Sequence, residues 1–304
     1  GFSQVHLVKK QAGFDGKFPG LRKPNPEEPE VFRIAEREAL REHADLMIAT
    51  DPDSDRIGAG VICDSKAFFF TGNQIGALLA DFLSRQGSVK GKIMVTTVVT
   101  GDLGSRIVTS RGATVIHTLT GSKFVCEEMN HMEAGEFLLG YEESHGYIGG
   151  MHIRDKDGVL AAMLICETAA WHKTQGRTLL DALEDLYQEY GYYIDEQDSF
   201  VFEGAKGAKE MQKIMARLRS RRGSVFAPLG KPDKILDYEK GVDELPQSNV
   251  LKFFFPNGSW VAVRPSGTEP KIKFYYCIRG KDQRQAQDLY EAVQTSVEEF
   301  LRTF

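Results

Sequence analysis

In the stretch Leu46-Met47-Ile48-Ala49-Thr50-Asp51-Pro52-Asp53-Ser54-Asp55-Arg56, three aspartates follow a short apolar run. The run is bounded by turn chemistry and predicts a buried strand. The three aspartates then leave the carboxyl end of that strand, where open α/β sheets place their ligands. Carboxylates this close repel one another unless a cation lies between them, and Mg²⁺ is the natural candidate. The planar guanidinium of Arg56 can donate two parallel hydrogen bonds to a phosphate, so the stretch predicts phosphoryl chemistry at a magnesium site.

Three other interpretations of this acidic loop need to be weighed. A calcium EF-hand is excluded, because its loop requires Gly at position six and Glu at position twelve, where this chain has Arg56 and Ile62. A solvated acidic turn remains open. A phosphatase that uses Asp51 as nucleophile and Asp53 as its second acid also remains open, since such enzymes place two alternating acids after a strand.

The whole chain has the composition of an ordinary globular protein. Its 304 residues predict two or three domains. With 38 basic and 43 acidic side chains, it shows no nucleic-acid surface, and no apolar run approaches the length of a membrane span. The four cysteines are widely separated, as in buried free thiols of a reducing compartment. We therefore expect a cytoplasmic protein with neither a nucleic-acid nor a membrane partner.

Hydrophobic periodicity divides the chain into three parts. Residues 1–72 combine a possible strand at 5–8, a Gly- and Pro-rich loop, a helix at 29–42 and strands on both sides of the acidic loop. Residues 73–195 alternate helices and strands, which predicts a doubly wound, largely parallel sheet of the α/β class. Residues 196–304 read as an α+β domain with a hairpin around Pro256–Ser259 and a closing helix.

Two further loops carry chemistry of their own. Residues 264–271 (R-P-S-G-T-E-P-K) combine a guanidinium, two hydroxyls, a Gly and an ammonium, and so predict a backbone nest for a phosphate, although a plain polar hairpin remains possible. No Walker-type lysine loop occurs, so the phosphate is not expected to belong to a nucleotide. Glu142 and Glu143 follow a predicted strand and suit the hydroxyls of a sugar ring, unless they form an exposed acidic turn. Lys156 lies in a charge-dense turn and suits proton transfer if it is partly buried.

The loops occur in an order that resembles the α-D-phosphohexomutase superfamily, which contains the phosphoglucomutases and phosphomannomutases. Residues 51–56 are similar to its D-x-D-x-D-R magnesium loop, and residues 141–147 (Y-E-E-S-H-G-Y) are similar to its sugar-selecting loop in the E-E-S-x-G-Y branch. Residues 264–270 resemble its phosphate-binding loop. The segments at 14–19 and 24–28 resemble its P-D-G-x-F-P and P-N-P-E motifs, and 120–124 its T-G-x-K turn.

The resemblance implies a mutase that converts a sugar 1-phosphate into a sugar 6-phosphate through a phosphoserine and a sugar bisphosphate, which also acts as activator. It assigns Mg²⁺ to Asp51, Asp53 and Asp55, and it implies a catalytic role for Arg56, Lys123 and Lys156. The residues that it implies for sugar and phosphate binding are Glu142, Ser144, Arg264, Ser266, Gly267 and Thr268.

One motif of that family is absent from these residues. The family's phosphoserine lies in a T-A-S-H-N-P loop of its first domain, and no such segment occurs here. We therefore expect a fragment that holds the end of domain II (1–72), domain III (73–195) and domain IV (196–304). Its partners would be the missing N-terminal domains of the same polypeptide. We expect the isolated fragment to be inactive as a mutase. A non-catalytic phosphosugar-binding protein and the Asp51 phosphatase remain the alternatives.

Overall fold

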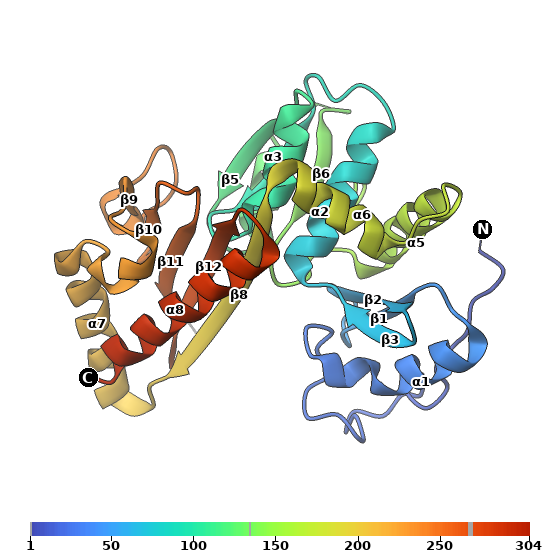
Figure 1. Cartoon of the computed structure of the whole chain (residues 1–304), viewed down its shortest axis with the longest axis horizontal. Coiled ribbons are helices and arrows are strands. Elements are labelled where there is room, and N and C mark those ends of the chain that lie inside the picture. Colours follow the sequence, from blue (N-terminus) through green and yellow to red (C-terminus); the bar gives the residue numbers. More distant parts are fainter. Residues whose placement is uncertain (1, 134, 267–269) are drawn as a thin grey trace. The chain divides into compact units, whose positions relative to one another are not determined.

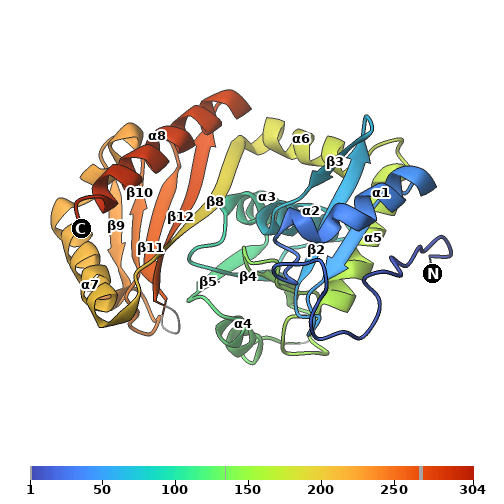
Figure 2. The same ribbon diagram turned by 90° about the horizontal axis from the view of Figure 1, so that it is seen from below.

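The computed structural model describes residues 2–133, 135–266 and 270–304, with the side chain of residue 205 outside that description. The chain forms two compact units, Gly1–Asp185 and Leu186–Phe304, and Figures 1 and 2 show their helices and strands. Within the described residues, unit 1 holds two sheets and unit 2 holds one. The mixed α/β class expected from the alternating pattern is confirmed.

The first sheet of unit 1 is antiparallel and carries the acidic loop. Its strands are β1 (Met47–Thr50), β2 (Ile57–Cys63) and β3 (Lys66–Phe69), in the order β1-β2-β3. The 3-10 turn η1 (Pro29–Phe32) and helix α1 (Arg33–Glu42) pack on one face, where Phe32 lies against Phe69. The acidic loop is thus the connection of an antiparallel β1–β2 hairpin that pairs Thr50 with Ile57.

The strand considered possible at residues 5–8 does not form. That segment is irregular, and 77% of Val5 and 65% of Leu7 remain exposed. A strand gains stability from pairing and from burying one face, and this segment does neither. The Gly- and Pro-rich loop that follows is irregular as expected.

The second sheet of unit 1 is the doubly wound one. Its order is β5-β4-β6-β7, in which β4 pairs in parallel with both β5 and β6, and β7 adds antiparallel to β6. These strands are β4 (Ile93–Thr97), β5 (Thr114–Thr118), β6 (Phe137–Tyr141) and β7 (Tyr147–Ile148). The unit's other helices are α2 (Gly72–Arg85), α3 (Asp102–Ser110), α4 (Ser122–Met129), α5 (Gly158–Lys173) and α6 (Leu179–Tyr190), the last of which continues into unit 2.

Both faces of this sheet are covered, as two neighbouring residues of β6 show. Tyr141 is buried against Gly76 of α2 and Gly104 of α3, where a Cβ would meet the tyrosine ring. The preceding residue, Gly140, faces Val125 of α4 on the opposite side. Because successive strand residues point to opposite faces, helices must lie on both sides, as in a doubly wound fold.

Unit 2 is one antiparallel sheet backed by helices. Its order is β8-β12-β11-β10-β9, and it consists of β8 (Tyr192–Val201), β9 (Lys234–Asp237), β10 (Leu251–Phe254), β11 (Trp260–Pro265) and β12 (Lys271–Gly280). Its helices are α7 (Gly204–Arg221) and α8 (Gln283–Leu301), with the short turns η2 (Ser224–Leu229) and η3 (Tyr238–Lys240). Helices α7 and α8 lie along one face of the sheet, where alternate residues of β10, β11 and β12 form the core (Figure 2). The expected hairpin pairs Phe254 with Trp260.

The expected boundary near residue 196 falls inside β8. All ten residues of this strand pair with β12, from Tyr192 opposite Gly280 to Val201 opposite Lys271. The two compact units divide between Asp185 and Leu186, within α6.

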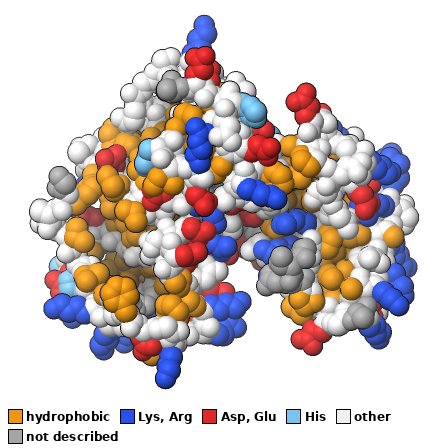
Figure 3. All heavy atoms as spheres, turned by 180° about the vertical axis from the view of Figure 1, so that it is seen from behind, with side chains coloured by type: hydrophobic (Ala, Val, Ile, Leu, Met, Phe, Trp, Pro, Cys, Tyr) orange, Lys and Arg blue, Asp and Glu red, His pale blue; other side chains and the backbone are white. Residues whose placement is uncertain are grey.

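The surface mixes charged and apolar side chains, as Figure 3 shows for one face. Among the described residues, the most exposed large apolar side chain is that of Phe14. All four cysteines are free, but only Cys126 and Cys277 are buried, so the expectation of buried thiols holds for two of the four. In the described ranges, no helix has both the length and the apolar character needed to cross a membrane.

Candidate active site

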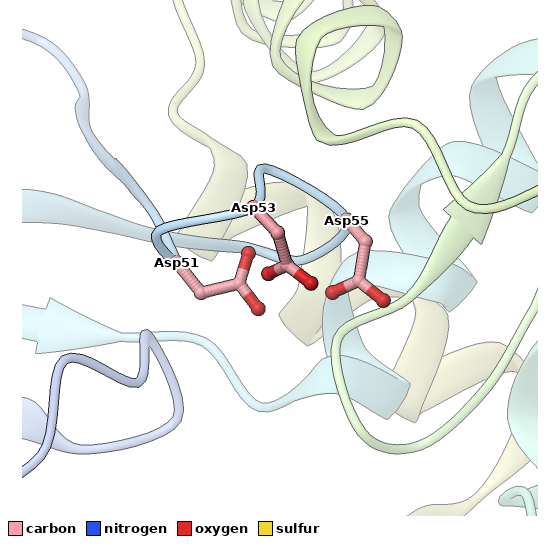
Figure 4. A group of neighbouring side chains, drawn as sticks. All are labelled: Asp51, Asp53 and Asp55. Atoms are coloured by element: carbon pink, nitrogen blue, oxygen red, sulfur yellow. The ribbon is translucent and has the colours of Figure 1, made fainter.

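The acidic loop is a tight turn that aims three carboxylates at one point. The backbone N–H of Ser54 donates to the carbonyl oxygen of Asp51 at 3.1 Å, and Ser54 itself adopts a left-handed conformation with φ of 57°. The N–H of Arg56 donates to Asp51 Oδ1, also at 3.1 Å. Figure 4 shows the side chains of Asp51, Asp53 and Asp55 directed into the same space below the loop.

The spacing of these carboxylates suits a small, hard cation. One oxygen from each of Asp51, Asp53 and Asp55 lies within 4.8 Å of the others. Magnesium–oxygen distances of about 2.0–2.1 Å place ligand oxygens roughly 3 Å apart when adjacent and roughly 4 Å apart when opposite. A small contraction of the loop therefore meets the requirement, and all three donors are the hard oxygens that Mg²⁺ prefers.

The outer two aspartates have opposite electrostatic environments. Burial, together with the nearby carboxylates of Asp55 and Asp53, raises the pKa of Asp51 to about 6, although the Arg56 N–H opposes the shift. Burial would also raise the pKa of Asp55, but Lys156, a hydrogen bond with Asp51 and the charge of Arg56 outweigh it and lower that pKa. A cation bound beside Asp51 would favour the charged form of its carboxylate and so oppose this shift.

Arg56 is held by an acid that lies far away in the sequence. Its Nη1 donates to Glu27 Oε1 at 2.8 Å, while its Nε lies 3.9 Å from Asp51 and 3.7 Å from Asp55. Gly58 permits this pairing, since a Cβ there would lie only 3.1 Å from the Cβ of Pro26. Glu27 was not among the predicted site residues, although its P-N-P-E segment is the signal that could have identified it.

Lys156 reaches the acidic loop from the segment before α5. Its Nζ forms an ion pair with Asp55 Oδ2, and only 12% of its side chain is exposed. The aliphatic part of Lys156 lies over Gly146, where a Cβ would come within 3.1 Å of its Cγ. The structure therefore brings Lys156, Asp55 and Gly146 together, and places the lysine where a partly buried ammonium can hold a proton.

The sugar-loop candidates Glu142 and Glu143 point to different partners. Glu142 is buried, and its Oε1 accepts the backbone N–H of Gly121 at 2.8 Å. Glu143 Oε2 accepts from the hydroxyls of Thr97, at 3.4 Å, and Thr100, at 3.3 Å. The two adjacent carboxylates thus anchor the loop at 141–147 to the turn at residues 120–123 and to the end of β4.

The remaining predicted residues of unit 1 border this loop. Ser144 is half-buried between Glu143 and His145. Lys123 is exposed in the first turn of α4, with its ammonium 4.6 Å from the ring centre of Phe124. The bond from Gly121 to Glu142 joins the turn that carries Lys123 to the sugar loop.

The phosphate-loop candidates lie in unit 2. Arg264 is half-buried on β11, opposite Lys273 of β12, and the N–H of Ser266 donates to the carbonyl of Lys271 at 2.8 Å. Gly267 and Thr268 lie outside the described residues. The described part of the loop is therefore a β11–β12 hairpin with a guanidinium at its base.

Comparison with protein families covers nearly the whole chain. Models of phosphoglucomutase/phosphomannomutase domain II, domain III and the C-terminal domain match residues 1–63, 71–190 and 200–295. The chain belongs to the phosphoglucomutase/phosphomannomutase family. The three matched models occur in the family's own order, and each contains one of the candidate loops, at residues 51–56, 141–147 and 264–270.

Bacterial phosphoglucomutases are close relatives in sequence. The chain is 36% identical over 307 residues to a phosphoglucomutase of Staphylococcus haemolyticus, covering 96% of the chain and 56% of the relative. It is 36% identical over 293 residues to one from Staphylococcus aureus, covering 91% of the chain and 52% of the relative. The chain therefore spans about half the length of the curated relatives it matches.

Solved structures of the family share the fold. A Paramecium phosphoglucomutase, pp63/parafusin in its open form, matches with a TM-score of 0.66 and 24% identity over 90% of this chain and 49% of its own. A family protein from Burkholderia thailandensis matches with a TM-score of 0.64 and 17% identity over 94% of this chain and 53% of its own. These two likenesses support the architecture of this phosphohexomutase chain.

Proposed function

We propose that this chain supplies the metal, sugar and distal-phosphate sites of a magnesium-dependent phosphosugar mutase of the phosphoglucomutase type. The reaction interconverts a sugar 1-phosphate and a sugar 6-phosphate through a phosphoserine and a sugar bisphosphate. The observation that carries the proposal is the convergence of Asp51, Asp53 and Asp55, with Arg56 and Lys156 beside them and the sugar loop attached to the same hairpin.

Three aspartates would hold Mg²⁺ in this proposal. A bound magnesium ion supplies positive charge to a phosphoryl group and to the oxygens between which it moves. Asp51, Asp53 and Asp55 offer only carboxylate oxygens, and a bound cation would oppose the effect of burial and of the neighbouring carboxylates, which raise the pKa of Asp51.

Arg56 and Lys156 frame the same position. Glu27 holds Nη1 of Arg56, and Nε lies beside Asp51 and Asp55, so the guanidinium borders the carboxylates, where it would meet a phosphoryl oxygen. Lys156 holds a proton next to Asp55, in a place where few water molecules reach it. We propose that this ammonium assists proton transfer at the sugar hydroxyl that receives the phosphoryl group.

The sugar and its second phosphate would be held by the other two loops. Glu142 and Ser144 would accept and donate hydrogen bonds to ring hydroxyls, and Lys123 would add a charge from the turn tied to Glu142. Arg264 and Ser266, together with Gly267 and Thr268, would bind the phosphate that is not transferred. Fixing that end of the substrate orients the reacting end.

The phosphoryl donor in this scheme is a serine phosphate. Its phosphorus–oxygen bond breaks as the free sugar hydroxyl attacks, and the other phosphate of the resulting bisphosphate later returns to the serine. No T-A-S-H-N-P segment occurs in these 304 residues. We therefore propose that the chain by itself binds metal and phosphosugar but does not turn over.

Two measurements test this function. Manganese binding should be detectable in the wild-type chain and should fall at least tenfold in Asp53→Asn, with Asp243→Asn as a control at another exposed turn aspartate. Incubation with glucose 1-phosphate, Mg²⁺ and glucose 1,6-bisphosphate should yield no glucose 6-phosphate. Unchanged manganese binding in Asp53→Asn would reject the metal site. Release of inorganic phosphate with an acid-stable label on Asp51 would support the phosphatase alternative instead.

A further inference from the structure

His145 lies at the centre of the sugar loop in an unusual backbone conformation. Its φ is 64°, in the left-handed region that a non-glycine residue rarely adopts, and the side chain is 6% exposed. The neighbouring Gly72 of α2 is tight against this segment, since a Cβ there would lie 2.9 Å from the His145 nitrogen. A buried residue in a strained conformation needs compensating contacts.

Those contacts are made with the metal loop. The N–H of Ile57 donates to the carbonyl oxygen of His145 at 3.0 Å, and the ring Nδ1 of His145 lies 3.0 Å from the carbonyl oxygen of Ile57. Because a carbonyl oxygen can only accept, Nδ1 carries the proton and donates. His145 thus bonds both backbone groups of the residue that directly follows Arg56.

The connection between the two loops extends on both sides of His145. Arg56 pairs with Gly146 as an antiparallel bridge, and the N–H of Gly158 donates to the carbonyl of Ser54 at 2.9 Å. The N–H of Asp157 donates to the carbonyl of Tyr147, also at 2.9 Å. The chain from 145 to 158 therefore borders the acidic turn from Ser54 to Ile57. Two of its side chains take part: Lys156 pairs with the carboxylate of Asp55, and His145 bonds the backbone of Ile57.

We propose that His145 is a positioning residue that couples the sugar loop to the metal loop, so that the conformation of one sets the cation affinity of the other. The inference rests on the proposed function. Ile57 is joined to the turn that holds Asp55, and a shift of its backbone changes where that carboxylate points. Binding of a sugar to the loop and binding of a cation to the aspartates then change each other's affinity by the same factor, as linkage requires.

The residue type at position 145 suggests a matched series of variants. Asparagine tolerates the left-handed backbone and carries an amide N–H close to the position of Nδ1, so His145→Asn retains both properties. Glycine accepts the backbone conformation but has no side chain, so His145→Gly removes the buried ring together with its hydrogen bond. His172 provides the control, since it is equally buried in unit 1 and neither ring nitrogen has a hydrogen-bond partner in the described part of the chain.

The test is manganese binding to the whole chain, measured from the electron paramagnetic resonance signal of free Mn²⁺. We expect His145→Gly to weaken binding about tenfold, His145→Asn to stay within about threefold of the wild type, and His172→Leu to bind as the wild type does. The energy of one hydrogen bond to a buried partner, about 1–1.5 kcal/mol, corresponds to that tenfold change.

A second measurement on the unmodified chain covers the case in which His145→Gly does not fold. Nitrogen-15 spectra of the histidine rings should show an Nδ1–H tautomer for His145, and adding Mg²⁺ should shift its signals but not those of His172. Wild-type affinity in folded His145→Gly, or unmoved His145 signals in a chain that binds Mg²⁺, would overturn the coupling. Manganese binding that survives Asp53→Asn would instead reject the proposed metal site itself.

Discussion

Gly72→Ala should disturb the sugar loop through a single added methyl group. Gly72 is the first residue of α2, and its carbonyl accepts the hydroxyl of Tyr147 at 2.9 Å. A Cβ at this position would lie 2.9 Å from both the carbonyl carbon of Glu143 and the nitrogen of His145, and closer still to the carbonyl oxygen of Glu143. These are backbone atoms, so the collision cannot be relieved by a change of rotamer.

The size of the effect follows from those distances. Ordinary contacts between carbon atoms are about 3.5–4.0 Å, so the loop must retreat by roughly 0.6–1 Å. Overpacking of this kind costs about 1–3 kcal/mol, and the better helix propensity of alanine returns less than about 1 kcal/mol. We expect a net loss of about 1–2 kcal/mol from the free energy of unfolding of unit 1. For a unit of this size the melting temperature should fall by about 2–8 °C.

Urea unfolding followed by tryptophan fluorescence measures this loss. Trp171 lies in unit 1 and Trp260 in unit 2, and they are the chain's two tryptophans, so a Trp260→Phe background reports on unit 1 alone. Gly87→Ala is the matched control, because nothing lies within 4 Å of a Cβ there and its effect should stay within about 0.5 kcal/mol. If Gly72→Ala is as stable as Gly87→Ala, and amide exchange at 142–147 is unchanged, the tight approach of α2 to the sugar loop is refuted.

Three further outcomes follow from the electrostatics and the loops. Since burial raises the pKa of Asp51 to about 6 and a cation requires its deprotonated form, Mn²⁺ affinity should be constant above about pH 7 and fall as the pH drops through 6; a flat profile from pH 5 to 8 would contradict this. Burial lowers the pKa of His172 from 6.5, so its neutral form stabilises unit 1 fully above pH 6.5, and that stability is lost as the pH falls toward the lower folded-state pKa. The difference between the urea midpoints of the wild type and His172→Leu should therefore be constant above pH 6.5 and should change below it. Arg264→Ala should weaken glucose 6-phosphate binding about tenfold in calorimetry without changing the unfolding of unit 2, and equal affinity would remove Arg264 from the phosphate site.

Local sequence patterns were sufficient for most of the secondary structure. The apolar run before Asp51 forms β1, the alternation after Asn73 forms the parallel β5-β4-β6 core, and Pro256–Ser259 turns the β10–β11 hairpin. In each case the signal comes from residues next to one another in the chain. Periodicity and turn chemistry are properties of this kind.

Elements that depend on a distant partner were harder to predict. Strand β8 begins at Tyr192, but its first residues mix aromatic and acidic side chains, and pairing with β12 about eighty residues later stabilises it as a strand. β9 has only four residues and is likewise defined by its pairing with β10. In both cases, pairing with another strand determines that the segment forms a strand.

The same distinction applies to the candidate site. Asp51, Asp53 and Asp55 lie in one turn, and their convergence followed from their spacing. Glu27 is 29 residues away from Arg56, and the contact depends on the absence of a side chain at Gly58. His145 is not among the residues assigned from the sequence, and a local pattern does not reveal its contact, since its partner Ile57 is 88 residues away and contributes only backbone atoms.

The way in which the sugar loop is attached has a consequence for how this enzyme family diversifies. Main-chain bonds hold much of the loop, among them Glu142 N–H to Gly146 C=O at 2.9 Å and Ile57 N–H to His145 C=O at 3.0 Å. Such bonds persist when a side chain is exchanged, so a replacement at Ser144, which we propose to bind the sugar, would alter the groups offered to the ligand while the loop keeps its backbone path. Single substitutions in the loop can then change substrate preference while its backbone stays the same. In this way one ancestral site can give rise to enzymes for different sugars.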